Sequence, residues 1–230
     1  TMDYYKYKRE IELMKKQNPT EYDMYSLIIA LIREGENVET LSVRDVSKRQ
    51  RSQRGQVFYG LSGIPDIVIL DEEFDNRDNN LKNLDNKDKI YGCVEVKDVN
   101  SSLLSIQDIL DKMLKCSKEK NLLNNEEEQI LGEILWFKKV LYTNGVRWRY
   151  IECEYKDQNL IKKLVKARIK HDSKEKEKKK ELPLERFKWC NNIDIHNLQI
   201  KEEDLLIDLY NCTENDWKEF VDKLHHMKWN

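Results

Sequence analysis

Three polar residues interrupt segments that otherwise have the apolar character of buried strands. Asp66 lies within the segment IPDIVIL, and Glu95 and Lys97 alternate with valines in YGCVEVK. Since consecutive side chains of a strand point to opposite faces, Glu95 and Lys97 are expected on the same face. If the two strands pair as a hairpin, Asp66 lies beside them. The pattern then predicts that two carboxylates and one ammonium group converge on one point.

Such a cluster suits a hard divalent cation and a phosphate ester. Carboxylate oxygens bind Mg²⁺ or Mn²⁺, and the cation keeps several of its waters. Lys97 could orient such a water, or lower its pKa, for in-line attack on phosphorus, while the cation offsets charge in the transition state. Glu-x-Lys also occurs on ordinary exposed strands, so the catalytic interpretation depends on the apolar segments around it.

The elements that must position these residues follow from apolar periodicity and turn residues. Strands are predicted over residues 64–70 and 90–96, with a polar loop over 71–89 between them. A helix is predicted from the Asn18-Pro19 start to about Glu34. Next come helices over 101–117 and 126–137, then a hairpin whose strands, 139–142 and 146–154, flank an Asn-Gly turn.

The composition changes after about residue 157. Residues 158–180 are predicted to form a helix that ends in a dense run of charges, and the rest of the chain is expected to be helical and acidic. The first part of this helix carries an apolar stripe that must pack on the preceding domain. We therefore expect a domain over residues 1–180 and a helical acidic C-terminal extension over 181–230. Truncation near residue 180 should be tolerated, and truncation near residue 157 should not.

In order and spacing, these motifs resemble the PD-(D/E)XK nuclease superfamily, and in particular the nuclease region of type I restriction enzyme R subunits. GIPD at 63–66 and VEVK at 94–97 look like the two halves of the superfamily signature. EQILGE at 128–133 and YTNGVRW at 142–148 resemble the glutamine-bearing helix and the strand that follow. The resemblance spans roughly residues 18–155. Those subunits carry a helicase motor, but this chain has no GxxxxGK[ST] phosphate-binding loop, so it would be a stand-alone nuclease or one that borrows its motor.

The resemblance implies a restriction-endonuclease-like α/β core with a mixed central sheet flanked by helices. It also implies that Asp66, Glu95 and the main-chain carbonyl of Val96 bind Mg²⁺, for which Mn²⁺ could substitute. Lys97 would be the catalytic lysine, and Gln129 would lie at the edge of the site. The implied function is an endonuclease that hydrolyses DNA phosphodiester bonds, in defence or mobile-element biology. The alternative is a non-catalytic module on the same fold that binds nucleic acid or protein.

Glu21 has two interpretations of equal weight. It could be an upstream acid that reaches the metal from the first predicted helix, because it shares a stripe with Tyr25 and Ile28. It could equally be a capping-box acid that only closes the start of that helix.

A basic segment precedes the first predicted strand and is the best candidate for phosphate contacts. Its cations are Arg44, Lys48, Arg49, Arg51 and Arg54, interleaved with glutamines. Arginine and glutamine suit contacts to the nucleic-acid backbone and to base edges, respectively. A solvated loop is the alternative interpretation.

The overall composition limits the partners and the compartment. The formal net charge of the 230 residues is −2, so any attraction to nucleic acid must come from a local patch. DNA is favoured over RNA, and the C-terminal region could bind a protein partner or a second copy. The five scattered cysteines and the absence of a long apolar run predict a cytoplasmic protein that does not enter a membrane.

Overall fold

A computed structural model of the chain describes residues 2–35, 40–49, 58–75, 88–115, 123–157, 159–167, 190 and 193–229. Within these ranges, no helix is both long enough and apolar enough to cross a bilayer.

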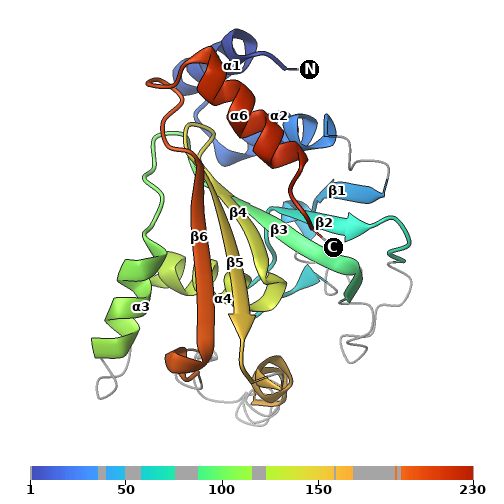
Figure 1. Ribbon diagram of the computed structural model, residues 1–230, viewed down its shortest axis with the longest axis vertical. Helices are drawn as coiled ribbons and strands as arrows, with labels where there is room; N and C mark the ends of the chain where they lie inside the picture. Colours follow the sequence, from blue (N-terminus) through green and yellow to red (C-terminus); the bar gives the residue numbers. More distant parts are fainter. Residues whose placement is uncertain are drawn as a thin grey trace, which may run out of the picture.

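Six strands form one mixed sheet, in which their order is the order of the chain (Figure 1). The strands are β1 (Leu41–Asp45), β2 (Ile67–Asp71), β3 (Ile90–Val96), β4 (Lys139–Thr143), β5 (Trp148–Tyr155) and β6 (Leu198–Leu206). β3 and β4 are parallel, and the other neighbouring pairs of the described sheet are antiparallel. The predicted α/β class with a mixed sheet is confirmed. β3 has the bounds expected from the sequence.

Helices cover both faces of the sheet, as the two hydrophobic cores show. One core contains α1 (Tyr4–Gln17), α2 (Glu21–Arg33) and α6 (Glu214–His225), and the other contains α3 (Ile106–Lys115), α4 (Asn125–Phe137) and the helical residues 160–167. Along β2, Ile67 and Ile69 belong to the first core, and Val68 and Leu70 to the second. Burial on both faces explains why the central strands are continuously apolar in sequence. In Figure 1, α6 lies in front of the upper part of the sheet and α4 passes behind it.

β2 begins at the end of the sheet where β3 and β4 end. Ile67, the first residue of β2, pairs with Val94, and Val96, the last residue of β3, pairs with Thr143 of the parallel strand β4. The residue before β2 and the residues after β3 therefore lie together. Ligand sites of α/β proteins commonly occupy the carboxyl ends of parallel strands.

The hairpin between β4 and β5 closes this end of the sheet. The side-chain oxygen of Asn144 accepts a hydrogen bond from the N–H of Arg147 at 2.8 Å. Gly145 has a φ of 80°, and a Cβ at this position would lie 2.8 Å from Cδ1 of Ile11, so both backbone conformation and space require glycine. The predicted Asn-Gly hairpin is confirmed, but its second strand begins at Trp148, two residues later than expected.

The N-terminal helices begin and end differently from the prediction. α1 was not predicted; it packs its buried residues Tyr7 and Ile11 in the first core. Asn18, expected to cap the start of the next helix, is the C-cap of α1, and its N–H donates to the carbonyl of Met14. α2 begins at Glu21 with Thr20 as its N-cap.

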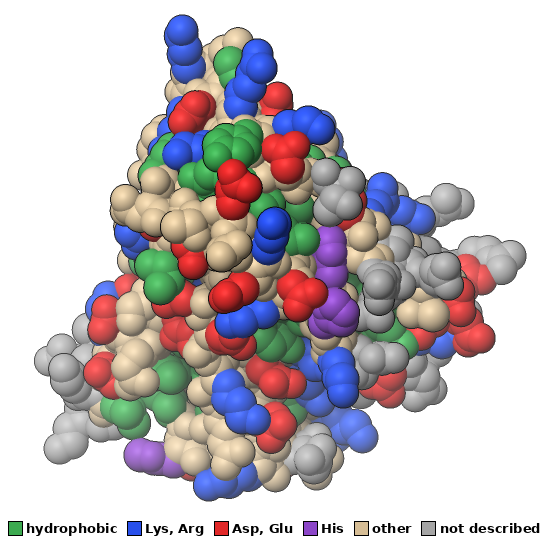
Figure 2. All heavy atoms as spheres, turned by 45° about the horizontal axis from the view of Figure 1, so that its top comes forward, with side chains coloured by type: hydrophobic (Ala, Val, Ile, Leu, Met, Phe, Trp, Pro, Cys, Tyr) green, Lys and Arg blue, Asp and Glu red, His purple; other side chains and the backbone are tan. Residues whose placement is uncertain are grey.

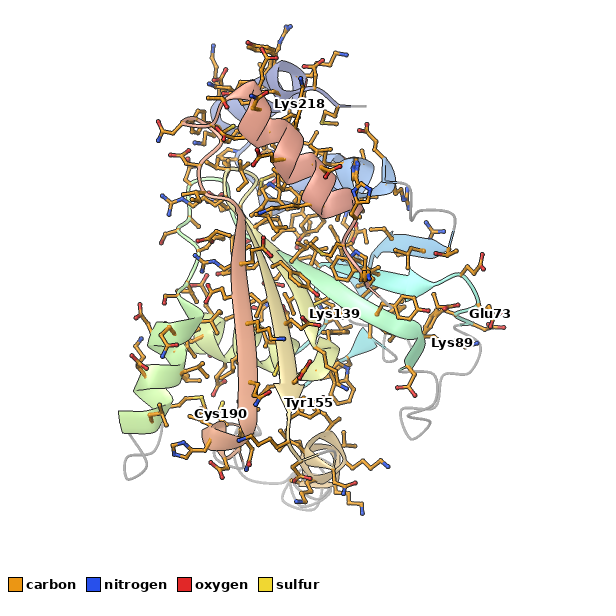
Figure 3. All side chains as sticks on the ribbon, in the orientation of Figure 1. Glu73, Lys89, Lys139, Tyr155, Cys190 and Lys218 are labelled. Carbon is orange, nitrogen blue, oxygen red and sulfur yellow. The ribbon has the colours of Figure 1, made fainter. Side chains whose placement is uncertain are left out.

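The expectation of an all-helical C-terminal region is wrong for residues 198–206, which form the strand β6. β6 pairs with β5 from Trp148 to Tyr155, and α6 packs in the core that it shares with α1 and α2. The end of the chain also lies against the sheet: Nζ of Lys139 on β4 donates to the carbonyls of Lys228 and Trp229 (Figure 3). β6, α6 and the residues after α6 therefore pack with the sheet and the helices that precede them in the chain.

Candidate functional site

Asp66 lies between β2, β3 and α2, and both of its carboxylate oxygens accept hydrogen bonds. The hydroxyl of Tyr25 on α2 donates to Oδ1 at 2.5 Å, and the N–H of Val96 donates to Oδ2 at 2.9 Å. The carbonyl of Asp66 accepts from the N–H of Val46, which follows β1. These three contacts come from three different elements, so they fix both the backbone and the side chain of Asp66.

Glu95 precedes Val96 on β3. Its side chain points to the face of the sheet opposite to that of the Val96 side chain, toward α4. Its Oε1 accepts hydrogen bonds from Nζ of Lys97 and from Nε2 of Gln129, each at 2.8 Å. Glu95 is 1% exposed and Lys97 is 7% exposed, so the ion pair is buried. Glu95 and Lys97 thus share a face, as the spacing predicted, and Gln129 reaches them from α4.

Glu133 is part of this cluster, although the sequence analysis assigned it no role. It lies one helical turn after Gln129 on α4, is 1% exposed, and its Oε1 accepts a hydrogen bond from Nε2 of Gln129 at 3.3 Å. The carboxyl groups of Glu133 and Glu95 lie close enough to affect each other's pKa. The available signal was the spacing of Gln129 and Glu133 at i and i+4, which puts both on one helix face within an otherwise apolar run.

The carboxyl groups of the site resist ionisation because they are buried close together. Burial, followed by repulsion from Asp66, raises the pKa of Glu95 to about 8. Burial raises the pKa of Glu133 well above its ordinary value, and repulsion from Glu95 adds to the shift. Burial also raises the pKa of Asp66, against the hydrogen bonds from Tyr25 and Val96 that lower it. The site therefore favours any positive charge that can enter it.

Lys97 keeps its charge in this environment. Burial alone would lower the pKa of its ammonium group, but attraction to Glu95 and the hydrogen bond between them outweigh burial and raise the pKa. A lysine with a raised pKa is a poor proton acceptor at neutral pH. Lys97 is therefore suited to donate hydrogen bonds to a water or to an anion, and not to act as a general base.

Glu21 is close to the site at the first residue of α2, one turn before Tyr25. After burial, repulsion from Asp66 is the next largest cause that raises the pKa of Glu21, and the nearby Lys97 lowers it. The backbone of Asp98, directly after Lys97, also lowers the pKa of Glu21. A capping box needs its acid at the third position of the helix, but Glu21 is the first residue of α2. The N-cap residue, Thr20, also makes no side-chain capping hydrogen bond, so no capping box forms here. The position agrees with the interpretation as an upstream acid.

The structure describes part of the basic segment. Arg44 lies on β1 and Lys48 in the short 3-10 helix Ser47–Arg49, and both side chains are exposed. Nζ of Lys48 lies 5.7 Å from the ring centroid of Tyr22 on α2. Arg51, Arg54 and the side chain of Arg49 lie outside the described residues. On the face shown in Figure 2, positive and negative side chains of the described residues are interspersed, in keeping with a net charge of −2.

The residues present fit a divalent cation by their chemistry more than by their current arrangement. Oε2 of Glu95 is buried without a hydrogen-bond partner, which leaves an oxygen ligand aimed into the cluster. In the described part of the chain, however, no three Asp, Glu, His or Cys side chains already surround one point as metal ligands. Lys97 and Tyr25 contact the oxygens that a cation would need. Oε1 of Glu95 and Oδ1 of Asp66 could therefore bind a cation only if Lys97 and Tyr25 moved away from them.

Searches with this chain found no matching family model, no matching curated protein and no matching solved structure.

Proposed function

We propose that the protein is a metal-dependent nuclease with a restriction-endonuclease-like core, which hydrolyses DNA phosphodiester bonds at the Asp66–Glu95–Lys97 site. The observation that carries this proposal is that the half-buried Asp66 and the buried Glu95, two carboxylates whose pKa values are raised by burial and, for Glu95, by repulsion from Asp66, lie near one charged lysine at the end of the sheet. Two repelling carboxylates buried together have few structural purposes and suit a doubly charged cation.

Each residue has a role that follows from its position. Asp66 and Glu95 would hold Mg²⁺ or Mn²⁺, with Glu21 and the carbonyl of Val96 as further oxygen ligands. The cation would neutralise negative charge on the phosphate. Lys97, charged and next to Glu95, would donate hydrogen bonds to the attacking water or to a phosphate oxygen. Gln129 would keep Glu95 in place through its 2.8 Å hydrogen bond once Lys97 has moved.

The test is cleavage of linear, circular and single-stranded DNA, and of RNA, by the purified chain with Mg²⁺, Mn²⁺ or EDTA. The variants Asp66→Asn, Glu95→Gln and Lys97→Met should each lower the rate by about 10²–10³-fold or more, because each removes preorganised electrostatic stabilisation. Mn²⁺ binding, measured by calorimetry, should be lost in the first two variants. Unchanged cleavage by Glu95→Gln would refute the site.

β3 offers a matched control at its other end. Lys89 precedes the strand and pairs with Glu73 at 3.7 Å on the surface, as Figure 3 shows. Lys89→Met and Glu73→Gln remove the same chemical groups as Lys97→Met and Glu95→Gln, from a pair on the surface instead of a buried one. Both control variants should cleave at the rate of the wild type. A loss of activity in the controls would show that the assay reports general charge and not the site.

The hydrogen bonds of the site favour one alternative, a module that binds DNA or a protein without cleavage. Both oxygens of Asp66 and Oε1 of Glu95 already accept hydrogen bonds from within the chain, so these three oxygens have partners without a cation. Under this alternative the chain would bind DNA with no heat of Mn²⁺ binding and no cleavage under any condition.

A further inference from the structure

Tyr22 is an exposed aromatic side chain next to the proposed nuclease site. It lies on α2 between Glu21 and Tyr25, and 59% of its surface is exposed. Its ring packs edge-on against that of Tyr25, with 5.4 Å between the ring centroids. The hydroxyl of Tyr25 in turn donates to Asp66. A single tyrosine ring therefore separates the exposed ring of Tyr22 from a proposed metal ligand.

Lys48 completes the surface on the side of β1. Its exposed ammonium group lies 5.7 Å from the centroid of the Tyr22 ring, within the range of a cation–π contact. An aromatic face together with a free cation is the combination with which proteins hold one base and the phosphate beside it. An edge-on neighbour such as Tyr25 supports the ring of Tyr22 while it leaves ring surface open to solvent.

We propose that Tyr22 and Lys48 bind an unpaired DNA strand, with one base stacked on Tyr22 and a phosphate next to Lys48. The inference rests on the proposed nuclease function, to which it adds the substrate class: single-stranded or locally unpaired DNA. Paired bases have both faces covered by their neighbours in the duplex, so only an unpaired base can stack on Tyr22. The Tyr22–Tyr25–Asp66 contacts would then place the backbone of that strand beside the metal ligands.

The test measures binding in EDTA, so that no cleavage occurs, with a fluorescein-labelled oligo(dT) of about 20 nucleotides, which is longer than typical single-strand site sizes. Tyr22→Leu should weaken this binding by about five- to 100-fold, the range expected for one lost base stack. Tyr22→Phe retains the aromatic face and should bind within about twofold of the wild type. Binding to a blunt duplex should be the same in all three proteins.

Two exposed residues on other helices provide matched controls. Tyr5 on α1 is 64% exposed, and its hydroxyl contacts Glu214 on α6. Tyr5→Leu therefore removes an exposed tyrosine ring, as Tyr22→Leu does, but on a different helix. Lys48→Gln should reduce the slope of log affinity against log salt by about 0.7, the value for one phosphate contact on a single strand. Lys218→Gln on α6 should leave that slope unchanged (Figure 3).

The outcomes separate this inference from the nuclease proposal. If Tyr22→Leu binds oligo(dT) as tightly as Tyr5→Leu does, or weakens duplex binding equally, the inference is overturned, and cleavage at Asp66 and Glu95 is unaffected by that result. If the wild type cleaves DNA but binds no single strand, the inference also fails. If the Tyr22 dependence is observed and no DNA is cleaved, the binding surface stands and the nuclease proposal falls.

Discussion

Glu133 lies in the apolar run of α4 and contacts both Gln129 and Glu95, so its protonation state matters to the whole cluster. Its pKa is raised well above the ordinary value by burial and by the neighbouring carboxylates, and that of Glu95 is raised to about 8. A carboxyl whose pKa is higher in the folded than in the unfolded state retains a proton that unfolding releases. The stabilising contribution of such a carboxyl is full below its pKa in the unfolded chain, about 4.5, and declines as the pH rises; for Glu95 the decline extends to about pH 8.

The free energy of unfolding in EDTA should consequently fall between pH 6 and pH 8. Glu133→Gln carries an amide that does not ionise, so its free energy of unfolding should decline less across this interval. Urea unfolding at both pH values measures the difference, and comparison with the wild type cancels the groups common to both proteins. An equal decline in the variant would mean that Glu133 is not protonated in the folded protein.

At the scale of elements, β3 lies between α4 and the C-terminal residues, and the space around Gly92 shows how closely these parts pack. A Cβ at Gly92 would lie 2.5 Å from the ring of Trp229 and 2.7 Å from the carbonyl of Lys139. Gly92→Ala should therefore destabilise the fold by about 1–3 kcal/mol through overpacking. Trp229→Leu shortens the side chain that the alanine would meet, so the double variant should lose less than the sum of the single variants. Additive losses would show that the two residues do not meet.

The elements also show what the sequence could and could not predict. β2, β3 and α4 were predicted because each is buried along its length, and burial produces an apolar run or a clear periodicity. β1 and β6 were missed because edge strands carry charges that weaken this signal, as KEED does within β6. Within the site, Asp66, Glu95 and Lys97 follow from strand motifs. Glu133 and the contact of Tyr25 with Asp66 depend on how two helices are rotated against the sheet, which tertiary packing decides.

At the scale of the whole molecule, the last part of the chain belongs to the sheet and to one of its cores. β6 pairs along Trp148–Tyr155 of β5, and α6 contributes Trp217, Phe220 and Leu224 to the core around α1 and α2. Among the side chains that this helix helps to cover is the fully buried Trp148, whose ring lies 5.3 Å from that of Phe220. The expectation that truncation near residue 180 is tolerated therefore has to be reversed.

A fragment that ends at residue 180 should lack a cooperative thermal transition and bind no Mn²⁺, because it loses a sheet strand and much of one core. The result would be an exposed β5 edge, and such edges promote aggregation. Circular dichroism and limited proteolysis of the fragment measure the loss of structure. Adding the missing part as a separate peptide of residues 190–230 should restore the transition if β6 and α6 are what the fragment lacks. A 1–180 fragment that melts cooperatively on its own would show that the core around Asp66 and Glu95 is complete without them, whatever β6 adds to the sheet.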